Sequence, residues 1–229
     1  SWYNTTDKEF TISDSAQLAG LARMTNGTAE GVTGAVSFSG TTVKLGADVS
    51  LGGMTWTSIG SFVGTFDGQG YTIRGLKIQA AVTSGESNHG LFSTLGNQAV
   101  VRNLNVADAD ISVTNSGDKV RAGVIAGGTE KAASSAHNVI GTRIDSCSAT
   151  GSVSAVSTND KLTYAGGIAA SGEIGTAITN CWTDVSVTAI AKPVSNKNSM
   201  AGGIIGNSGN YAVIANCATF GTVYAASPS

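Results

Sequence analysis

A six-residue phrase, Ala122-Gly123-Val124-Ile125-Ala126-Gly127, returns twice in the chain with few changes. The later copies are Ala165-Gly166-Gly167-Ile168-Ala169-Ala170 and Ala201-Gly202-Gly203-Ile204-Ile205-Gly206, and a degenerate copy precedes them at His89-Gly90-Leu91-Phe92. The copies start at residues 89, 122, 165 and 201, so the interval varies between 33 and 43 residues. A repeat of this length is typical of solenoids, in which each unit stacks on the next.

Two further phrases follow each copy of the first. One reads Val101-Arg102-Asn103-Leu104, Ile144-Asp145-Ser146-Cys147, Ile178-Thr179-Asn180-Cys181 and Ile214-Ala215-Asn216-Cys217 in the four units. The other alternates apolar and polar residues, as in Ile111-Ser112-Val113, Val153-Ser154-Ala155-Val156, Val185-Ser186-Val187 and Val223-Tyr224-Ala225. Short β-branched stretches between Gly, Asn and Asp are typical of strands joined by tight turns. We therefore predict an all-β fold, a right-handed parallel β-helix of about six coils with three strands per coil.

The N-terminal region predicts the only helix. Ser13-Asp14-Ser15 followed by Gln17 resembles a capping box, and Leu18 and Leu21 fall on one face of the segment that follows. Because the end of a β-stack leaves backbone groups unpaired, we expect this helix to cover the first coil. We expect one domain over residues 1–229, with a strand and capping helix in 1–31, coils in 32–225 and a linker or tail in 226–229.

The composition limits the possible functions. The chain has 229 residues, of which 12% are charged, and 13 basic against 15 acidic side chains give a net charge of -2. Nucleic-acid binding is not expected, because it requires a basic surface to neutralise phosphates. No run of 18 apolar residues occurs, so we expect no membrane insertion. The chain has neither an initiating Met nor a signal segment, and we expect it to be part of a longer protein.

Two columns of like residues follow from stacking the repeats. Cys147, Cys181 and Cys217 occupy equivalent positions, and their parallel Cβ vectors do not suit a disulfide. We interpret them as a buried structural column. A metal site is not expected, because no further Cys or His recurs beside them. Asn103, Asn180 and Asn216 form a second column, with Ser146 in the remaining unit, and their amides are expected to hold a turn by hydrogen bonds along the coil axis.

Several segments together resemble bacterial cell-surface proteins built on the GLUG motif, a region also found in IgA-specific metallopeptidases. These segments are Ile12-Ser13-Asp14-Ser15-Ala16-Gln17-Leu18-Ala19-Gly20-Leu21-Ala22, Trp56-Thr57-Ser58-Ile59-Gly60, Phe66-Asp67-Gly68-Gln69-Gly70-Tyr71-Thr72-Ile73 and the recurring Ala-Gly-Gly-Ile phrase. The resemblance implies a secreted, surface-displayed β-helix module that acts as adhesin or stalk. It implies no catalysis here, because the peptidase activity of that family belongs to a separate zinc domain with a His-Glu-X-X-His helix. His89 and His137 do not have that spacing.

The longest polar insertions follow the same strand in each repeat, so we expect them to lie along one edge of the stack. Repeat proteins usually bind their ligands at such an edge. The candidate ligand-binding residues on this loop edge are Glu86, Asp118, Lys119, Arg121, Asp160, Lys161, Lys192 and Lys197. A glycan or a host or matrix protein is the expected partner, and no cofactor is expected. The alternative interpretation is that these charged residues only make the protein soluble and bind no ligand.

Two alternatives remain open. The first is a polysaccharide lyase or glycoside hydrolase, since enzymes of this architecture use clustered carboxylates. Asp110 and Asp184 fall at comparable places two coils apart, which predicts about 9.6 Å between them, near the upper limit for an inverting pair. The second alternative is an accessory domain of a secreted peptidase.

Overall fold

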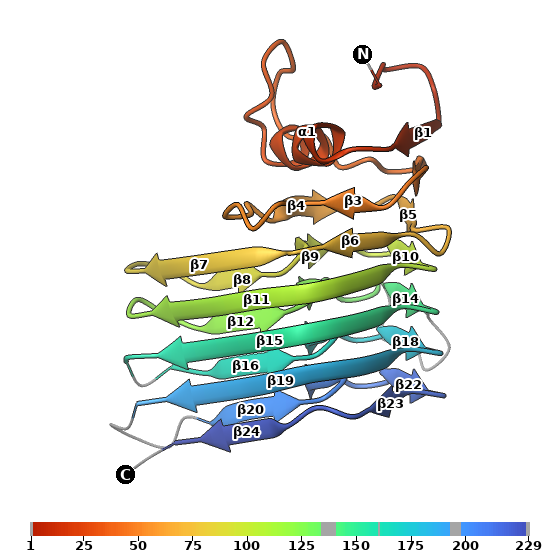
Figure 1. Cartoon of the computed structure of the whole chain (residues 1–229). Coiled ribbons are helices and arrows are strands. Elements are labelled where there is room, and N and C mark those ends of the chain that lie inside the picture. Colours follow the sequence, from red (N-terminus) through yellow and green to blue (C-terminus); the bar gives the residue numbers. More distant parts are fainter. Residues whose placement is uncertain (1, 134–140, 160, 193–197, 228–229) are drawn as a thin grey trace.

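The computed structural model describes residues 2–133, 141–159, 161–192 and 198–227. Its strands pair in parallel and wind as a right-handed coil, with α1 (Ser15–Thr25) at the N-terminal end of the stack (Figure 1). The all-β parallel β-helix of about six coils is confirmed. No helix in the described part of the chain has the length and apolar character needed to cross a membrane.

The strands form four sheets, here named A to D. Sheet A contains β1 (Glu9–Ile12), β2 (Thr42–Leu45), β5 (Thr65–Asp67), β10 (Val100–Arg102), β14 (Arg143–Asp145), β18 (Ala177–Thr179) and β22 (Val213–Ala215). Sheet B contains β3 (Val49–Ser50), β6 (Thr72–Arg74), β7 (Lys77–Val82), β11 (Asn105–Asn115), β15 (Ser148–Ser157), β19 (Trp182–Ala191), β23 (Ala218–Thr219) and β24 (Val223–Ala226). Sheet C contains β4 (Ile59–Phe62), β9 (Phe92–Leu95), β13 (Ala126–Thr129), β17 (Ala169–Gly172) and β21 (Ile205–Ser208). Sheet D contains β8 (Ser87–His89), β12 (Val120–Gly123), β16 (Thr163–Gly166) and β20 (Ser199–Gly202).

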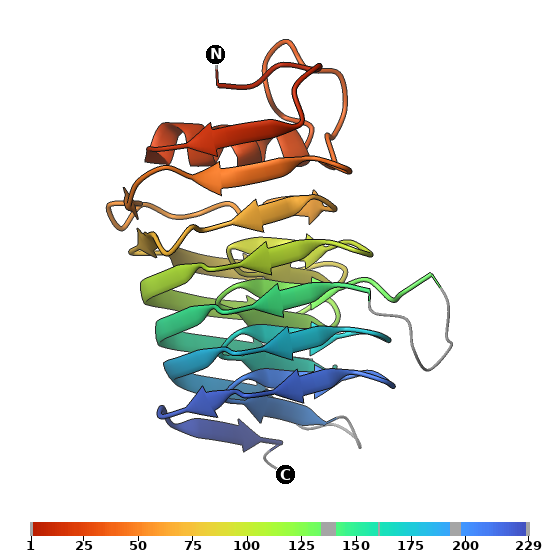
Figure 2. The same ribbon diagram turned by 90° about the vertical axis from the view of Figure 1, so that its right-hand side faces the viewer.

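Each complete coil passes through sheets D, C, A and B, so it has four strands where the sequence predicts three. The difference arises in the Ala-Gly phrase, which bends into two strands, β12 and β13. Gly123 lies at this bend, and a Cβ on it would clash with Ala126 O. Figure 2 shows the strands of sheet A directly above one another in successive coils.

The core lies inside the coils and consists of apolar side chains in register. Val101, Ile144 and Ile178 occupy one such column in sheet A, and none of them is exposed. Near the N-terminal end the column broadens into an aromatic cluster, in which the Phe92 ring lies 5.3 Å from Phe62 and 5.4 Å from Phe66 between centroids. Rings at these distances stabilise the stack beyond the burial of their area.

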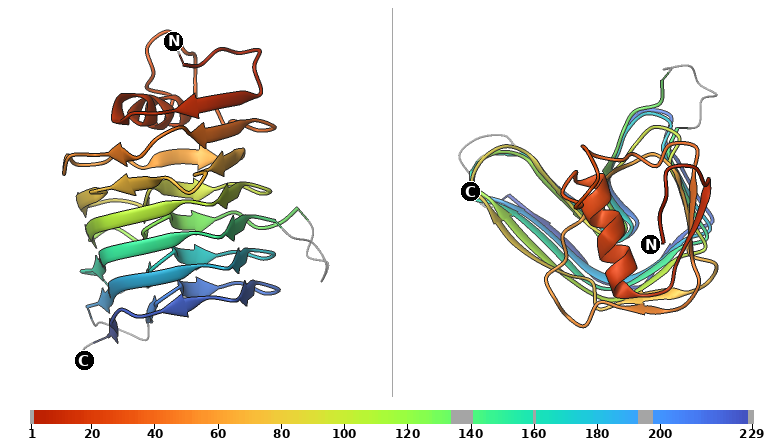
Figure 3. Two further views of the ribbon diagram at one scale, coloured as in Figure 1. Left: turned by 45° about the vertical axis from the view of Figure 1, so that its right-hand side comes forward. Right: turned by 90° about the horizontal axis from the view of Figure 1, so that it is seen from above.

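The expected capping helix is present and begins as the sequence indicates. Asp14 is the N-cap residue, and its carboxylate accepts a hydrogen bond from Gln17 N at 2.8 Å. The Gln17 side chain accepts in turn from Ser13 N at 2.7 Å, which completes the reciprocal cap. Leu18 and Leu21 are fully buried against the first coils. Seen from above, α1 lies across the central part of the stack (Figure 3).

Candidate functional site

The loops that join sheet B to sheet D lie above one another along one edge of the stack, at the left in Figure 1. They connect β7 to β8, β11 to β12 and β15 to β16, the last described except at residue 160, and between β19 and β20 the structure describes only residues 192 and 198. The long strands of sheet B turn back there into sheet D, so each coil has a narrow lobe at this edge (Figure 3). Six of the eight candidate ligand-binding residues have described positions on these loops or beside them. Asp160 and Lys197 lie outside the described residues.

Three of the candidate residues form one ion-pair cluster between neighbouring coils. Glu86 accepts hydrogen bonds from Lys119 Nζ at 2.8 Å and from Arg121 Nη1 at 2.9 Å. These bonds from Lys119 and Arg121 lower the pKa of Glu86, and partial burial opposes them only in part. Lys161 continues the pattern to the next coil, with its Nζ 4.0 Å from Asp118 Oδ1. The edge is therefore a preorganised array in which most charges already have partners.

Two residues that the sequence did not single out complete this cluster. Arg121 also donates to Asn88 Oδ1 at 3.0 Å, and its guanidinium carbon lies 5.9 Å from the centre of the Tyr164 ring. Asn88 and Tyr164 are the register partners of Arg121 in the coils on either side. Aligning the repeats would have found both. Lys192, by contrast, is exposed after β19 and has no ion pair with any residue that the structure describes.

The cysteine column occupies equivalent positions between sheets A and B. Cys147, Cys181 and Cys217 are free thiols, and each directly follows the turn after β14, β18 or β22. Cys147 and Cys181 are each 1% exposed. Burial raises the pKa of the Cys147 thiol, and the neighbouring Cys181 thiol raises it further. Leu104 takes the same place one coil earlier and is fully buried, which indicates an apolar packing position.

The asparagine column forms the turn immediately before the cysteines. Asn103, Ser146, Asn180 and Asn216 all have a positive φ, between 52° and 54°, a region where Asn is among the residues best tolerated. The hydrogen bonds along the axis run from Asn216 Nδ2 to Asn180 Oδ1 at 3.2 Å and from Asn180 Nδ2 to Asp145 Oδ1 at 2.8 Å. Asn103 instead donates to Asp67 Oδ1 at 3.1 Å in the preceding coil. The side-chain hydrogen bonds between successive turns therefore form a ladder made of amides and carboxylates.

The proposed carboxylate pair of a hydrolase is out of register. Asp110 pairs with Ser152, which pairs with Ser186, so Asp184 lies two residues away from the position opposite Asp110. With a rise of about 3.3 Å per residue and about 4.8 Å per coil, the two Cα atoms lie about 12 Å apart. The expected alignment was wrong because β19 alternates apolar and polar residues, so Val185 and Val187 are equivalent in the sequence pattern, and in the structure it is Val187 that shares the register of Ile111. Asp110 instead lies 3.8 Å from Lys77 Nζ.

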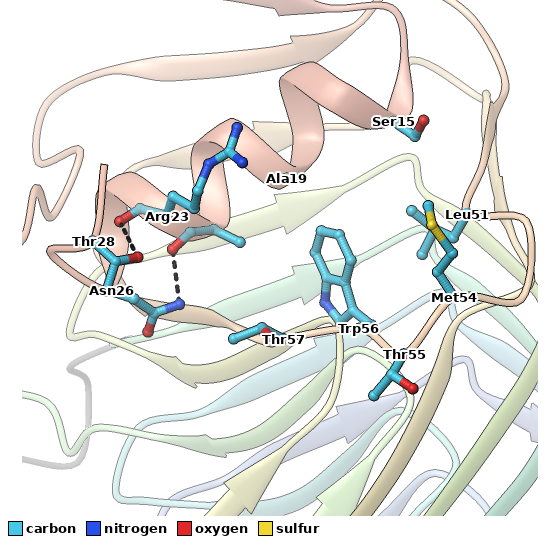
Figure 4. A pocket seen from close by; sticks show the side chains of 11 residues that line it. Ser15, Ala19, Arg23, Asn26, Thr28, Leu51, Met54, Thr55, Trp56 and Thr57 are labelled. Carbon is cyan, nitrogen blue, oxygen red and sulfur yellow. Dashed lines mark hydrogen bonds between the residues drawn. The ribbon is translucent and has the colours of Figure 1, made fainter. Parts of the chain in front are cut away.

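A cleft of about 300 Å³ lies between α1 and the coil beneath it (Figure 4). The Trp56 ring stands between the helix and the side chains of Leu51 and Met54, and its Nε1 donates to Leu91 O at 3.2 Å. Arg23 lies on the helix side of the cleft and has no acidic partner among the described residues. Within the same ranges, no group of three His, Cys, Asp or Glu side chains comes together to hold a metal ion.

The fold has a counterpart among solved structures. The crystal structure of a proposed immunoglobulin A1 protease from Bacteroides ovatus is similar, with a TM-score of 0.55 and 17% sequence identity. The match covers 98% of this chain and 80% of that one. At such low identity the similarity concerns the fold alone. No protein-family model matches the chain, and no curated protein does.

Proposed function

We propose that this chain is a non-catalytic, extracellular module of a bacterial surface protein of the GLUG type. Its role would be that of an adhesin or stalk that binds a glycan or a host or matrix protein along the loop edge. The observation that carries this proposal is the Glu86–Lys119–Arg121 cluster, which ties loops of successive coils to one another. Loops fixed in this way keep a constant spacing, which suits many weak contacts along a rigid surface.

The charge arrangement favours recognition by shape and hydrogen bonds over recognition by net charge. Glu86 compensates Lys119 and Arg121, and Asp118 lies close to Lys161. Among the candidates with described positions, Lys192 alone has no ion pair with another described residue, so we expect it to contribute a free charge. A neutral glycan or a polar protein surface fits such an edge better than a polyanion does.

A second candidate is an accessory domain of a secreted peptidase. It is favoured only by the fold shared with the Bacteroides ovatus protein. In that role the module would position a substrate for a catalytic domain elsewhere in the same protein. A polysaccharide hydrolase is less well supported, because Asp110 and Asp184 do not share a register.

The test is binding of the 229-residue chain to a glycan array and to immobilised matrix proteins. Any ligand found is then measured against the double variant Lys161→Ala/Lys192→Ala and against the matched control Arg143→Ala, which removes an exposed charge from sheet A. We expect the double variant to weaken binding at least threefold and the control to leave it unchanged. Equal loss in both, or no ligand in either assay, would contradict a binding role for the loop edge.

A further inference from the structure

The lobe is open at the N-terminal end of the stack, because the chain there passes directly from sheet B to sheet C and forms no lobe. Thr55 pairs with Lys77, and Ile59 pairs with Phe92. Residues 55 to 59, five residues, therefore cover a path that takes sixteen residues, 77 to 92, in the next coil. As a result β7 and β8 extend beyond the coil above them, as Figure 1 shows at the left. We call the upper edges of β7 and β8 the ledge.

The ledge exposes backbone groups that no described strand pairs. Asp110 N donates to Leu76 O and Ser116 N donates to Val82 O, so the even-numbered residues of β7 point their backbone groups down to β11. Lys77 O accepts from Trp56 N above it. Because these directions alternate along a parallel strand, the N–H and C=O groups of Gln79 and Ala81 point up to the open side.

The ledge has none of the devices that usually protect such an edge. Beyond Lys77, β7 contains neither a charged residue nor a proline, and it ends in Ala80, Ala81 and Val82. Natural sheets normally protect free edges with charges, prolines, bulges or a covering element. The capping helix lies over the central part of the stack and leaves the lobe uncovered (Figure 3).

A hollow of about 330 Å³ opens between the ledge and the segment of residues 55–58 that crosses above it, and Ile78, Ala80 and His89 are among the residues that line it. His89 takes the place that Ala122 and Ala165 occupy in the coils below. Its Nε2 atom is buried and has no hydrogen-bond partner. An unpaired buried nitrogen is costly, and a group entering the hollow would satisfy it.

We propose that the ledge binds an extended peptide segment of a partner protein, which adds a parallel strand above β7. The main chain of the segment would bond to Gln79 and Ala81, and its alternate side chains would point into the hollow. The lining combines Trp56, Ile78 and Ala80 with uncharged polar residues and His89, so we expect these side chains to be small and uncharged, with a polar one for His89. The ledge lies on a different part of the stack from Lys161 and Lys192, so this inference is independent of the proposed loop-edge binding.

The experiment uses a synthetic strand as probe, the acetylated and amidated peptide Ser-Val-Ser-Ala-Val-Ser. It copies residues 152 to 157 of β15, which already form a parallel pair with β11. The control peptide has N-methyl groups on its first Val and its Ala, whose N–H groups would face β7. We expect the first peptide to slow hydrogen exchange of the Gln79 and Ala81 amides at least tenfold, measured by NMR, and the control peptide to have no effect.

Two variants test the direction of the backbone groups. Ala81→Pro removes an N–H that points to the open side, so we expect an unchanged melting temperature and loss of peptide binding. The matched variant Ala80→Pro removes an N–H that points to β11, and we expect it to lower the melting temperature. Equal binding of both peptides, no protection of Gln79 and Ala81, or protection only by oligosaccharides would overturn the proposal. The peptide comparison is made on the unmodified chain, so it does not depend on how either variant folds.

Discussion

Asn216 donates a hydrogen bond from its Nδ2 to Asn180 Oδ1, one coil away, at 3.2 Å, and both residues have φ near 54°. The Asn side chain thus serves two purposes at these turns between sheets A and B. It tolerates the left-handed backbone, and it links successive turns along the axis.

Replacement of Asn180 separates these two purposes. Asn180→Ala loses the bonds to Asp145 and Asn216 and also places alanine at positive φ, so we expect a loss of about 2 kcal/mol in the free energy of unfolding. Asn180→Gly loses the bonds but removes the backbone strain, so we expect it to cost about 1 kcal/mol. Urea denaturation of both variants measures the difference. If glycine were no better than alanine, the left-handed backbone would not matter at this turn.

The three thiols should differ in reactivity according to their place in the column. Cys147 and Cys181 are almost completely buried, whereas Cys217 is partly exposed. Burial raises the pKa of Cys217, so it should react slowly at neutral pH and faster as the pH rises. We expect iodoacetamide to modify Cys217 alone in the native protein and all three in urea, as mass spectrometry of peptides would show. Native labelling of Cys147 would mean that the column is not buried as described.

The sequence predicted the periodic part of this molecule well and its exceptions poorly. The coil, the cap and the two columns follow from repeated residues, because a parallel stack places like residues over one another. The bulge between Val106 and Ala109 was not visible, since one displaced residue leaves the apolar alternation on both sides intact. The turn at Asp67-Gly68-Gln69-Gly70 is another exception. Gln69 and Gly70 both have a positive φ there, and Gly68 is needed because a Cβ at this position would clash with Asn103 O.

The ledge was missed for a related reason. It results from the short path between Thr55 and Ile59, in a part of the chain where the repeat is degenerate. The charged residues on the loop edge were predicted, but the pairing of Glu86 with both Lys119 and Arg121 of the next coil depends on loop conformation. Periodicity therefore identifies which coils stack, whereas local deviations from it determine where the surface is open.

Acid should weaken the fold through the carboxylates of the ladder. The pKa of Asp145 lies below its ordinary value of 3.8, because Thr179 and Asn180 donate hydrogen bonds to it, with partial burial acting in the opposite direction. A carboxyl with a lowered folded-state pKa stabilises the fold above the pKa of the unfolded chain, and this contribution is lost as the pH falls through the folded value. We expect the free energy of unfolding to decrease below about pH 4. Asp145→Asn should be less stable at pH 7 and show a smaller decrease, and an identical decrease would contradict this role.

His89 should make a second contribution, at higher pH. Burial lowers the pKa of His89 below its ordinary value of 6.5, so the folded chain binds this proton less readily than the unfolded chain does. The contribution of neutral His89 to the free energy of unfolding is therefore complete above pH 6.5. It is lost as the pH falls from 6.5 toward the pKa of His89 in the folded chain. His89→Ala places at this position the residue found at Ala122 and Ala165, and it removes the unpaired Nε2. We expect the variant to be as stable as the parent at pH 7.5, or more stable, and to lose the dependence on pH between 7 and 5. Thermal melts of both proteins across this range measure the effect. A variant that keeps the full dependence would show that His89 does not cause it and that this side chain is protonated as readily in the folded chain as in the unfolded one.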